Sequence, residues 1–292
     1  MPAVQSVRTI RRKIRSVNNI KKITRAMQMV SAAKLRKVQD RLMAVRPYAD
    51  KIGEFLGELV PQVRDLRYPL FVPREQVKNV AVVMIMADKG LCGSFNANLA
   101  RVATNFMLER TIPIRTMAIG KKSLDFLRKR KETPFRSIVD VPTEIPFSQI
   151  REMTRSLVAL FERGEVDEVF VLYTRYVNAM TFRPSIFKFL PVEPDRVKGV
   201  EASHDEAREY IFEPGPGEIL EKLIPRYVEV TFHRLLLESM SSEHAARMNA
   251  MKNATDNAEE LVGDLTLTYN KARQSGITKE LLDIVGGAEA LK

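Results

Sequence analysis

Residues 248–272 read MNAMKNATDNAEELVGDLTLTYNKA, and this stretch decides how the chain folds. Within it, apolar or small side chains recur at spacings of three and four residues, the pattern of a helix that lies against another helix. These positions are Met248, Met251, Thr255, Ala258, Val262, Leu265, Tyr269 and Ala272. Apart from Gly263, no glycine or proline occurs between Arg226 and Ser275. A helix of about 50 residues rises roughly 75 Å, so this seam needs a long partner.

The other end of the chain offers that partner. No glycine or proline occurs between residues 3 and 46, so a long helix is permitted there. Three apolar blocks follow the same spacing: Val7, Ile10, Ile14 and Val17; Ile20, Ile23, Met27 and Val30; and Leu35, Val38, Leu42 and Val45. The steps of three and five residues between the blocks predict that the seam slips there. We expect the helix to continue past Pro47 to Val60, before Pro61, and to pair antiparallel with the C-terminal helix.

The middle of the chain alternates between strand and helix patterns. Residues 79–87 read NVAVVMIMA, a continuous apolar run that is typical of a parallel strand covered on both faces. Further strands are expected at 113–119, 135–139, 168–176 and 182–190, and helices at 94–110, 121–131 and 147–163. This order predicts an open, Rossmann-like α/β sheet with right-handed crossovers.

The predicted fold class is therefore α/β, with a long antiparallel coiled coil of the terminal helices and an inserted Rossmann-like domain. We expect the N-terminal helix to span 1–60 and the α/β domain to span 75–192. A proline- and glycine-rich connection or hairpin follows at 193–217, and the C-terminal helix takes 218–292. An enzyme has no obvious use for a rod made from both of its ends, whereas a mechanical part does.

The composition is that of a folded, soluble protein, with 45% hydrophobic and 28% charged residues and a net charge of +11. No run of 18 or more apolar residues occurs, and residues 1–9 lack the apolar core of a signal peptide. Basic residues dominate the first 49 positions, where Asp40 is the one acidic residue. This excess of positive charge indicates polyanionic partners, acidic protein surfaces or anionic headgroups.

The loop at residues 88–96, DKGLCGSFN, follows the first expected strand, where α/β proteins often bind ligands. Its glycines could admit a phosphate, but it matches neither GxGxxG nor GxxxxGK[ST]. We favour a shaped loop with Ser94 as a helix cap. The three histidines lack metal-ligand spacing, and the single cysteine, Cys92, is more typical of a small buried hydrophobe than of a nucleophile. We therefore expect no catalytic site, no cofactor and no metal.

Near the C-terminus, Gly276 begins the stretch GITKELLD and suggests that the helix restarts there. Thr278 is placed to cap the new helix, although Leu281 leaves the capping box incomplete. Arg273 and Gln274 are polar residues at the end of the long apolar seam. From the residues alone, solvated surface is as good an interpretation of them as function.

Several motifs together resemble one known family, the gamma subunit of F-type ATP synthase, over essentially the whole chain. They are IRSVNNIKKITRAMQMVSAAKLR at 14–36, DKGLCG at 88–93, YIFEP at 210–214, EHAARMNAMKNATDN at 243–257, YNKARQ at 269–274 and ITKELLDIVGGAEAL at 277–291. The last block is highly specific for that family.

The resemblance implies a non-catalytic central shaft inside a ring of three alpha and three beta subunits. It also implies that the α/β domain binds the epsilon subunit and rests on the membrane c ring. Rotation of that ring would be coupled through the shaft to ATP synthesis and hydrolysis at beta. The implied location is the cytoplasmic side of a bacterial inner membrane, with membrane association only through the complex and no nucleic-acid partner.

The resemblance also places the residues that would contact the ring. Contacts with beta fall on Arg247, Arg273, Gln274 and Thr278, with Met27 at the matching level of the N-terminal helix. Lys89 and Cys92 lie where the family meets an acidic segment of beta. The apolar tip, represented by Ile284, Val285 and Leu291, would sit in a hydrophobic sleeve of the ring.

Two alternatives remain at this point. The basic N-terminal helix could belong to a coiled-coil nucleic-acid-binding protein, whose affinity would fall steeply with salt. The scarcity of aromatic residues there weakens that hypothesis. An α/β enzyme could instead use the loop from Gly90 to Ser94, and it would bind nucleotide as an isolated chain.

Overall fold

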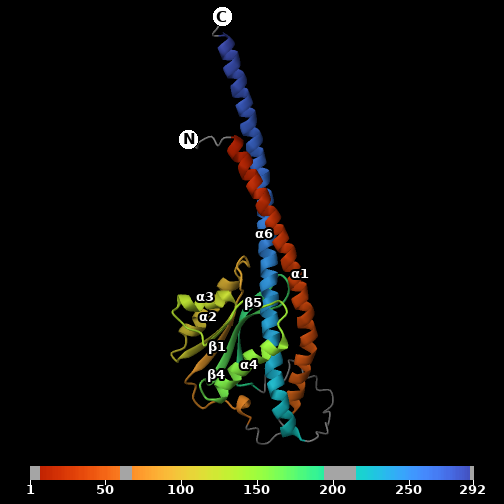
Figure 1. Cartoon of the computed structure of the whole chain (residues 1–292), viewed down its shortest axis with the longest axis vertical. Helices are drawn as coiled ribbons and strands as arrows, with labels where there is room; N and C mark the ends of the chain where they lie inside the picture. Colours follow the sequence, from red (N-terminus) through yellow and green to blue (C-terminus); the bar gives the residue numbers. More distant parts are fainter. Residues whose placement is uncertain (1–6, 60–67, 194–214, 290–292) are drawn as a thin grey trace. The chain divides into compact units, whose positions relative to one another are not determined.

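The computed structural model describes residues 7–59, 68–193 and 215–289. Two long helices, α1 (Val7–Leu59) and α6 (Pro216–Glu289), enclose in sequence a five-stranded sheet with its own helices (Figure 1). The chain divides into two compact units. The first combines residues 1–31 with 248–292, and the second spans residues 32–247.

In the first unit, α1 and α6 pair as antiparallel helices. The hydroxyl oxygens of Thr24 and Thr255 lie 2.7 Å apart, and Lys21 Nζ lies 2.8 Å from a carboxylate oxygen of Glu259. From the first pair to the second, the residue number falls on α1 and rises on α6, so the two helices run antiparallel. The eight seam positions expected on α6 are all buried or half-buried, from Met248 to Ala272, so the predicted seam on α6 is confirmed.

The seam expected in the middle of α1 is wrong. Ile20, Ile23 and Val30 are 50%, 59% and 58% exposed, and Met27 is only half-buried. The inward positions are instead Lys21, Thr24, Gln28 and Ser31, which extend one unbroken three-and-four spacing of buried or half-buried residues along α1. The apolar block is displaced by one residue, which turns it about 100° around the helix. A continuous helix cannot rotate one segment by that angle and then rotate it back.

The second unit is built on a mixed sheet with strand order β3-β2-β1-β4-β5. Its strands are β1 (Val80–Ile85), β2 (Ile114–Ile119), β3 (Arg136–Ile138), β4 (Glu168–Tyr176) and β5 (Phe182–Leu190). The first four are parallel, whereas β5 runs antiparallel to β4. The connecting helices are α2 (Phe95–Leu108), α3 (Lys121–Lys129) and α4 (Phe147–Glu162), and a short helix η2 (Pro69–Phe71) precedes β1. The expected order of strands and helices is confirmed.

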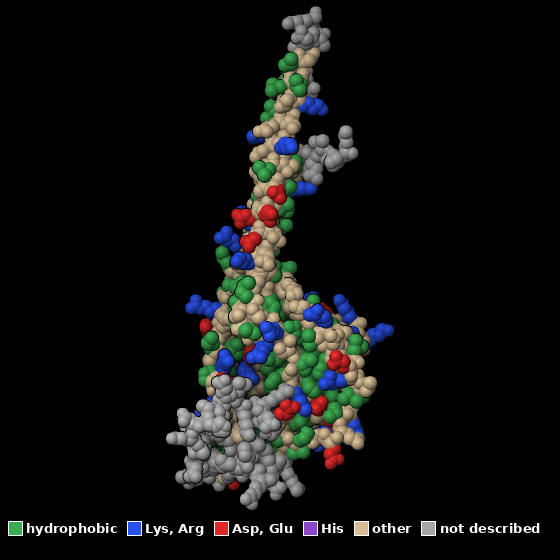
Figure 2. Space-filling view, turned by 180° about the vertical axis from the view of Figure 1, so that it is seen from behind, with side chains coloured by type: hydrophobic (Ala, Val, Ile, Leu, Met, Phe, Trp, Pro, Cys, Tyr) green, Lys and Arg blue, Asp and Glu red, His purple; other side chains and the backbone are tan. Residues whose placement is uncertain are grey.

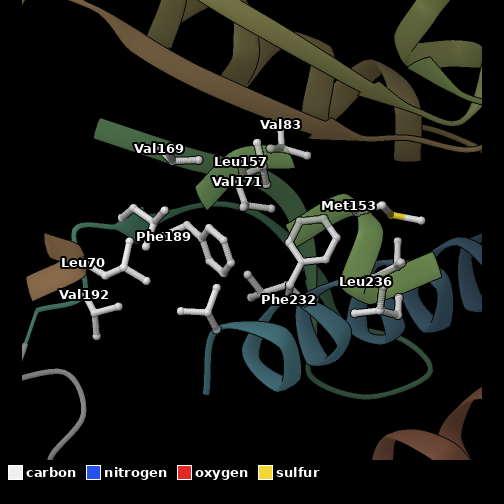
Figure 3. Close-up of a cluster of buried hydrophobic side chains, with 14 of the residues drawn as sticks. Leu70, Val83, Met153, Leu157, Val169, Val171, Phe189, Val192, Phe232 and Leu236 are labelled. Carbon is white, nitrogen blue, oxygen red and sulfur yellow. The ribbon is translucent and has the colours of Figure 1, made fainter. Parts of the chain in front are cut away.

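The side chains of β1 alternate between two cores, as a strand buried on both faces requires. Val80, Val82 and Met84 join a core that includes residues of α2 and α3. Ala81, Val83 and Ile85 join a larger core with α4, α6 and the C-terminal part of α1. Figure 3 shows side chains of this larger core converging between α6, α4 and the sheet. The ring centroids of Phe189 and Phe232 lie 5.6 Å apart there.

Three predictions about where helices begin, continue or end had different outcomes. Pro47 lies inside α1, as expected, and α1 ends at Leu59. The helix restart at Gly276 is wrong, because α6 continues to Glu289 and the hydroxyl of Thr278 donates to the Gln274 carbonyl within it. Ser94 occupies the N-cap position of α2 but makes no capping side-chain hydrogen bond.

The domain boundaries inferred from the sequence stay predictions. Most of the connection expected at 193–217 lies outside the described residues, and so does the YIFEP motif. Leu291, one of the residues assigned to the apolar tip, also lies outside them.

Candidate functional site

The carboxyl ends of strands β1 and β4 mark the place where open α/β sheets usually bind ligands. The chain order reverses between β1 and β4, and the pairing of these strands ends at Met84 and Leu172. Beyond that pair β1 and β4 are no longer paired with each other. Backbone groups of Ile85 and Thr174 that would bond the neighbouring strand therefore need other partners. Such a topological switch point is the first place to look for a bound nucleotide.

Helix α6 occupies this place with its own side chains. The hydroxyl of Ser242 donates to the carbonyl of Thr174 at 3.0 Å. The hydroxyl of Ser239 lies 3.4 Å from the Ile85 carbonyl, to which it donates, and 3.5 Å from the Thr174 amide, from which it accepts. Ser239 and Ser242 are buried. The helix thus satisfies the backbone groups that the diverging strands leave open.

The loop after β1 is organised by Asp88. Its carboxylate accepts hydrogen bonds from the amides of Lys121, Asp140 and Val141 at 2.8–2.9 Å. Lys121 is the first residue of α3, so a carboxylate of the chain itself already takes the anion position at that helix N-terminus. Asp88 therefore ties the loops after β1, β2 and β3 together, which gives the DKG sequence a structural role.

Arg247 of α6 holds the same loop from the other side. Its guanidinium donates to the carbonyls of Lys89, at 3.0 Å, and Gly90, at 3.3 Å. It also donates to the carboxylate of Glu243 at 2.7 Å. Arg247 is only 9% exposed. The guanidinium therefore makes its hydrogen bonds within the chain, and these bonds fix the loop.

Burial shifts the pKa values of two residues beside Arg247. Burial raises the pKa of the Glu243 carboxyl, against the opposing effect of Arg247. Burial, with Arg247 and Lys34 nearby, lowers the pKa of His244 to about 4. His244 is therefore neutral at physiological pH, buried beside a fixed cation.

A cavity of about 350 Å³ lies between α6 and the loops at this end of the sheet. Its lining includes the cations Lys34, Lys89 and Arg247 and the carboxylates Asp88, Asp140 and Glu243. These charges balance, and Asp88 and Arg247 already have partners. The cavity therefore offers no net attraction for a phosphate. Among the described residues, no group of three or more His, Cys, Asp or Glu side chains is placed to hold a metal ion.

The loop exposes Leu91 rather than Cys92, the residue that the family resemblance assigned to a contact with beta, and the prediction that Cys92 is a small buried hydrophobe is confirmed. Cys92 is 1% exposed and packs with Ala87, Phe95 and Ala246. Burial raises the pKa of its thiol, and Asn96 donates a hydrogen bond to its sulfur at 3.2 Å. Lys89 is exposed, and so is Leu91, which is 62% exposed. No spacing signal in DKGLCG distinguishes the outward leucine from the inward cysteine.

The last described turns of α6 form a second candidate surface. From Arg273 to Val285 every described side chain is exposed, whereas Ala272 is still half-buried. Arg273, Gln274 and Thr278 lie at the start of this segment. Ile277, Leu281 and Leu282, together with Ile284 and Val285, are between 51% and 69% exposed. Figure 2 shows hydrophobic and basic side chains along this end of the helix.

Comparison with known proteins addresses the family directly. A family model described as ATP synthase matches residues 6–291. The ATP synthase gamma chain of Symbiobacterium thermophilum is 43% identical, with 99% of each chain covered. The gamma chain of Dehalococcoides mccartyi is 44% identical over 98% of this chain and 99% of its own. The chain belongs to the ATP synthase gamma chain family.

A solved structure agrees with this assignment. The chain resembles one from the central stalk and c ring of the Tetrahymena thermophila mitochondrial ATP synthase, with a TM-score of 0.60 and 25% identity. The similarity covers 80% of this chain and 99% of the other. As a gamma chain family member, the chain is a subunit of ATP synthase, and the nucleic-acid-binding alternative is not favoured. No helix in the described parts of the chain is long and apolar enough to span a bilayer.

Proposed function

We propose that the chain is the central-stalk rotor of a bacterial F-type ATP synthase and carries no active site of its own. It couples rotation of the membrane c ring to ATP synthesis and hydrolysis at the beta subunits. The observation that carries this proposal is the gamma chain likeness along the whole length of a chain whose ends form a helix pair. A stiff helical element whose orientation changes the relative affinities of three sites can couple them without bond chemistry.

The assembly follows from the same family membership. Three alpha and three beta subunits surround one copy of the chain, and the α/β domain contacts the epsilon subunit and the c ring. The chain binds the membrane only through this complex, on the cytoplasmic side of the inner membrane.

The contact residues for the ring fall into two groups. The first is the exposed end of α6, where Arg273, Gln274 and Thr278 offer hydrogen bonds to beta. Ile284 and Val285 continue this surface as an apolar tip, to which Leu291 is also assigned. Exposed apolar side chains on a helix that nothing else in the described chain covers are typical of an interaction surface.

The second group surrounds the loop after β1. Exposed Lys89 faces an acidic segment of beta. Arg247, which binds two loop carbonyls, and Cys92, a buried residue of the loop itself, hold the loop in place for this contact. Met27, half-buried on α1, is not part of this second group and contributes a contact with beta from the N-terminal helix.

Reconstitution with alpha and beta subunits tests the rotor proposal. We expect a 3:3:1 complex whose ATP hydrolysis depends on the chain. Either the lack of such a complex, or hydrolysis that is indifferent to the chain, would refute the proposal.

A double variant tests the upper contacts. Arg273→Ala with Gln274→Ala should lower coupled turnover several-fold and leave the thermal stability of the chain unchanged, because both side chains are exposed. Lys252→Ala with Asn253→Ala, equally exposed on α6, is the matched control and should behave as the unmodified chain. Arg247 is unsuited to this test, since its loss would also disturb the loop that it holds.

A further inference from the structure

Leu91 combines a strained backbone with an exposed apolar side chain. Its φ angle is 60°, in the left-handed region that disfavours a branched side chain, and its side chain is 62% exposed. Glycine would remove the strain, and a polar residue would remove the exposed apolar surface. Neither stability nor solubility therefore accounts for a leucine here.

The other non-glycine residues with positive φ in the described chain have local explanations. Lys131, with φ 61°, follows the end of α3, where its amide donates to the Arg128 carbonyl. A left-handed residue commonly ends a helix in this way. Asp140, with φ 54°, places its amide against the carboxylate of Asp88. Leu91 ends no helix.

The loop around Leu91 is rigid by construction. Arg247 binds the carbonyls of the two preceding residues, Lys89 and Gly90. On the other side, the buried Cys92 anchors the chain, and Asn96 bonds both the Cys92 sulfur and the Ala87 amide. The strained backbone of Leu91 is thus held between two fixed points, which aim its side chain at solvent. Strain that the surroundings maintain is a feature of binding sites.

We propose that Leu91 is a preorganised apolar contact for the beta subunit. It enters an apolar recess of beta, while Lys89 beside it pairs with a carboxylate at the rim. The proposal rests on the rotor function and extends the contact region already assigned to Lys89. It transfers the apolar contact from Cys92, which is buried, to the residue before it. A preformed contact loses less conformational entropy on binding than a mobile one.

Leu91→Asn tests this proposal, because asparagine accepts the left-handed conformation but supplies no apolar surface. In the isolated full-length chain, its melting temperature should equal or exceed that of the unmodified chain. In the whole ATP synthase with its membrane part, ATP-driven proton pumping should fall at least about fivefold, which corresponds to roughly 1 kcal/mol. A residue with a purely structural role would not lower turnover while preserving or raising stability.

Two further variants act as controls. Lys131→Asn relieves the same backbone strain at a distant loop, so it should preserve or raise the melting temperature and leave pumping unchanged. Leu91→Met keeps the apolar surface and should retain most of the pumping.

Two results would overturn the proposal. One is pumping by Leu91→Asn equal to that of Lys131→Asn, and the other is a loss in Leu91→Met as large as in Leu91→Asn. If the unmodified chain itself forms no 3:3:1 complex, the rotor function fails instead.

Discussion

Thr24 of α1 and Thr255 of α6 meet in the seam of the first unit, with their hydroxyl oxygens 2.7 Å apart. Each hydroxyl also lies within hydrogen-bond distance of a carbonyl of its own helix, at Lys21 and Met251. Both threonines are buried. A buried polar pair in the seam of a coiled coil can specify its register at some cost in stability. We interpret this pair as the register mark of the two helices.

Valine substitutions test that interpretation. Either Thr24→Val or Thr255→Val alone should lower the free energy of unfolding by about 1 kcal/mol, because one hydroxyl loses its cross-helix partner. The double variant should recover most of that loss, since two valines pack without polar groups. A double-mutant cycle in urea measures the coupling. Additive losses in the double variant would show that the pair makes no specific contribution.

Ser242 and Ser241 form a natural matched pair in the contact between α6 and the sheet. Both are fully buried, but only Ser242 reaches the Thr174 carbonyl, whereas the Ser241 hydroxyl has no hydrogen-bond partner among the described residues. Ser242→Ala should cost about 1–2 kcal/mol and speed amide exchange at the end of β4. Ser241→Ala should be neutral or slightly stabilising. Equal effects of the two substitutions would contradict the role of Ser242.

Gly120 is required where α3 begins. Its φ is +88°, and an added Cβ would lie 2.0 Å from the carbonyl oxygen of Met86. Gly120→Ala should therefore destabilise the chain by about 3 kcal/mol or more, through backbone strain and displacement of β1. Gly263→Ala is the control, because nothing lies within 4 Å of that helical position. It should raise stability by up to about 1 kcal/mol.

His244 should make the chain sensitive to mild acid. Its pKa is about 4 in the folded chain against an ordinary 6.5, so below pH 6.5 the unfolded chain binds the proton that the folded chain refuses. Stability is then lost as pH falls from about 6.5 towards 4, by roughly 2 kcal/mol at pH 5. The raised pKa of Glu243 acts in the opposite direction, since protonation of the buried carboxyl favours the folded state.

The variant His244→Gln separates these two effects. It should lose distinctly less stability than the unmodified chain between pH 7 and pH 5, as measured by urea unfolding at each pH. The same acid sensitivity in both proteins would exclude His244 as its source.

Periodicity predicted the parts of the fold that rest on local pattern. The seam from Met248 to Ala272 and the strands β1, β4 and β5 were within reach because each pattern persists over several turns or residues. The loop after β1 was also singled out, from its place behind an apolar strand. The burial of Cys92 was predicted as well, whereas the exposure of Leu91 beside it was not, because no spacing pattern in so short a loop marks its outward side.

Tertiary contacts decided the rest. On α1, the apolar residues Ile20, Ile23 and Val30 are better core candidates by hydrophobicity, yet Lys21, Thr24 and Ser31 are the less exposed positions. Lys21 and Thr24 contact α6 directly. One continuous helix has one buried stripe, and its direction is set by the whole length of the pairing rather than by any single block.

Arg247 shows the same division at the candidate site. An arginine in a helical motif looks like a surface contact until the fold brings two loop carbonyls to its guanidinium. The sequence alone determined the helices, the order of the strands and the family likeness, because these depend on spacing along the chain. Which side chains are exposed at the candidate site was decided by the tertiary structure, because burial depends on what packs against each residue from distant parts of the chain.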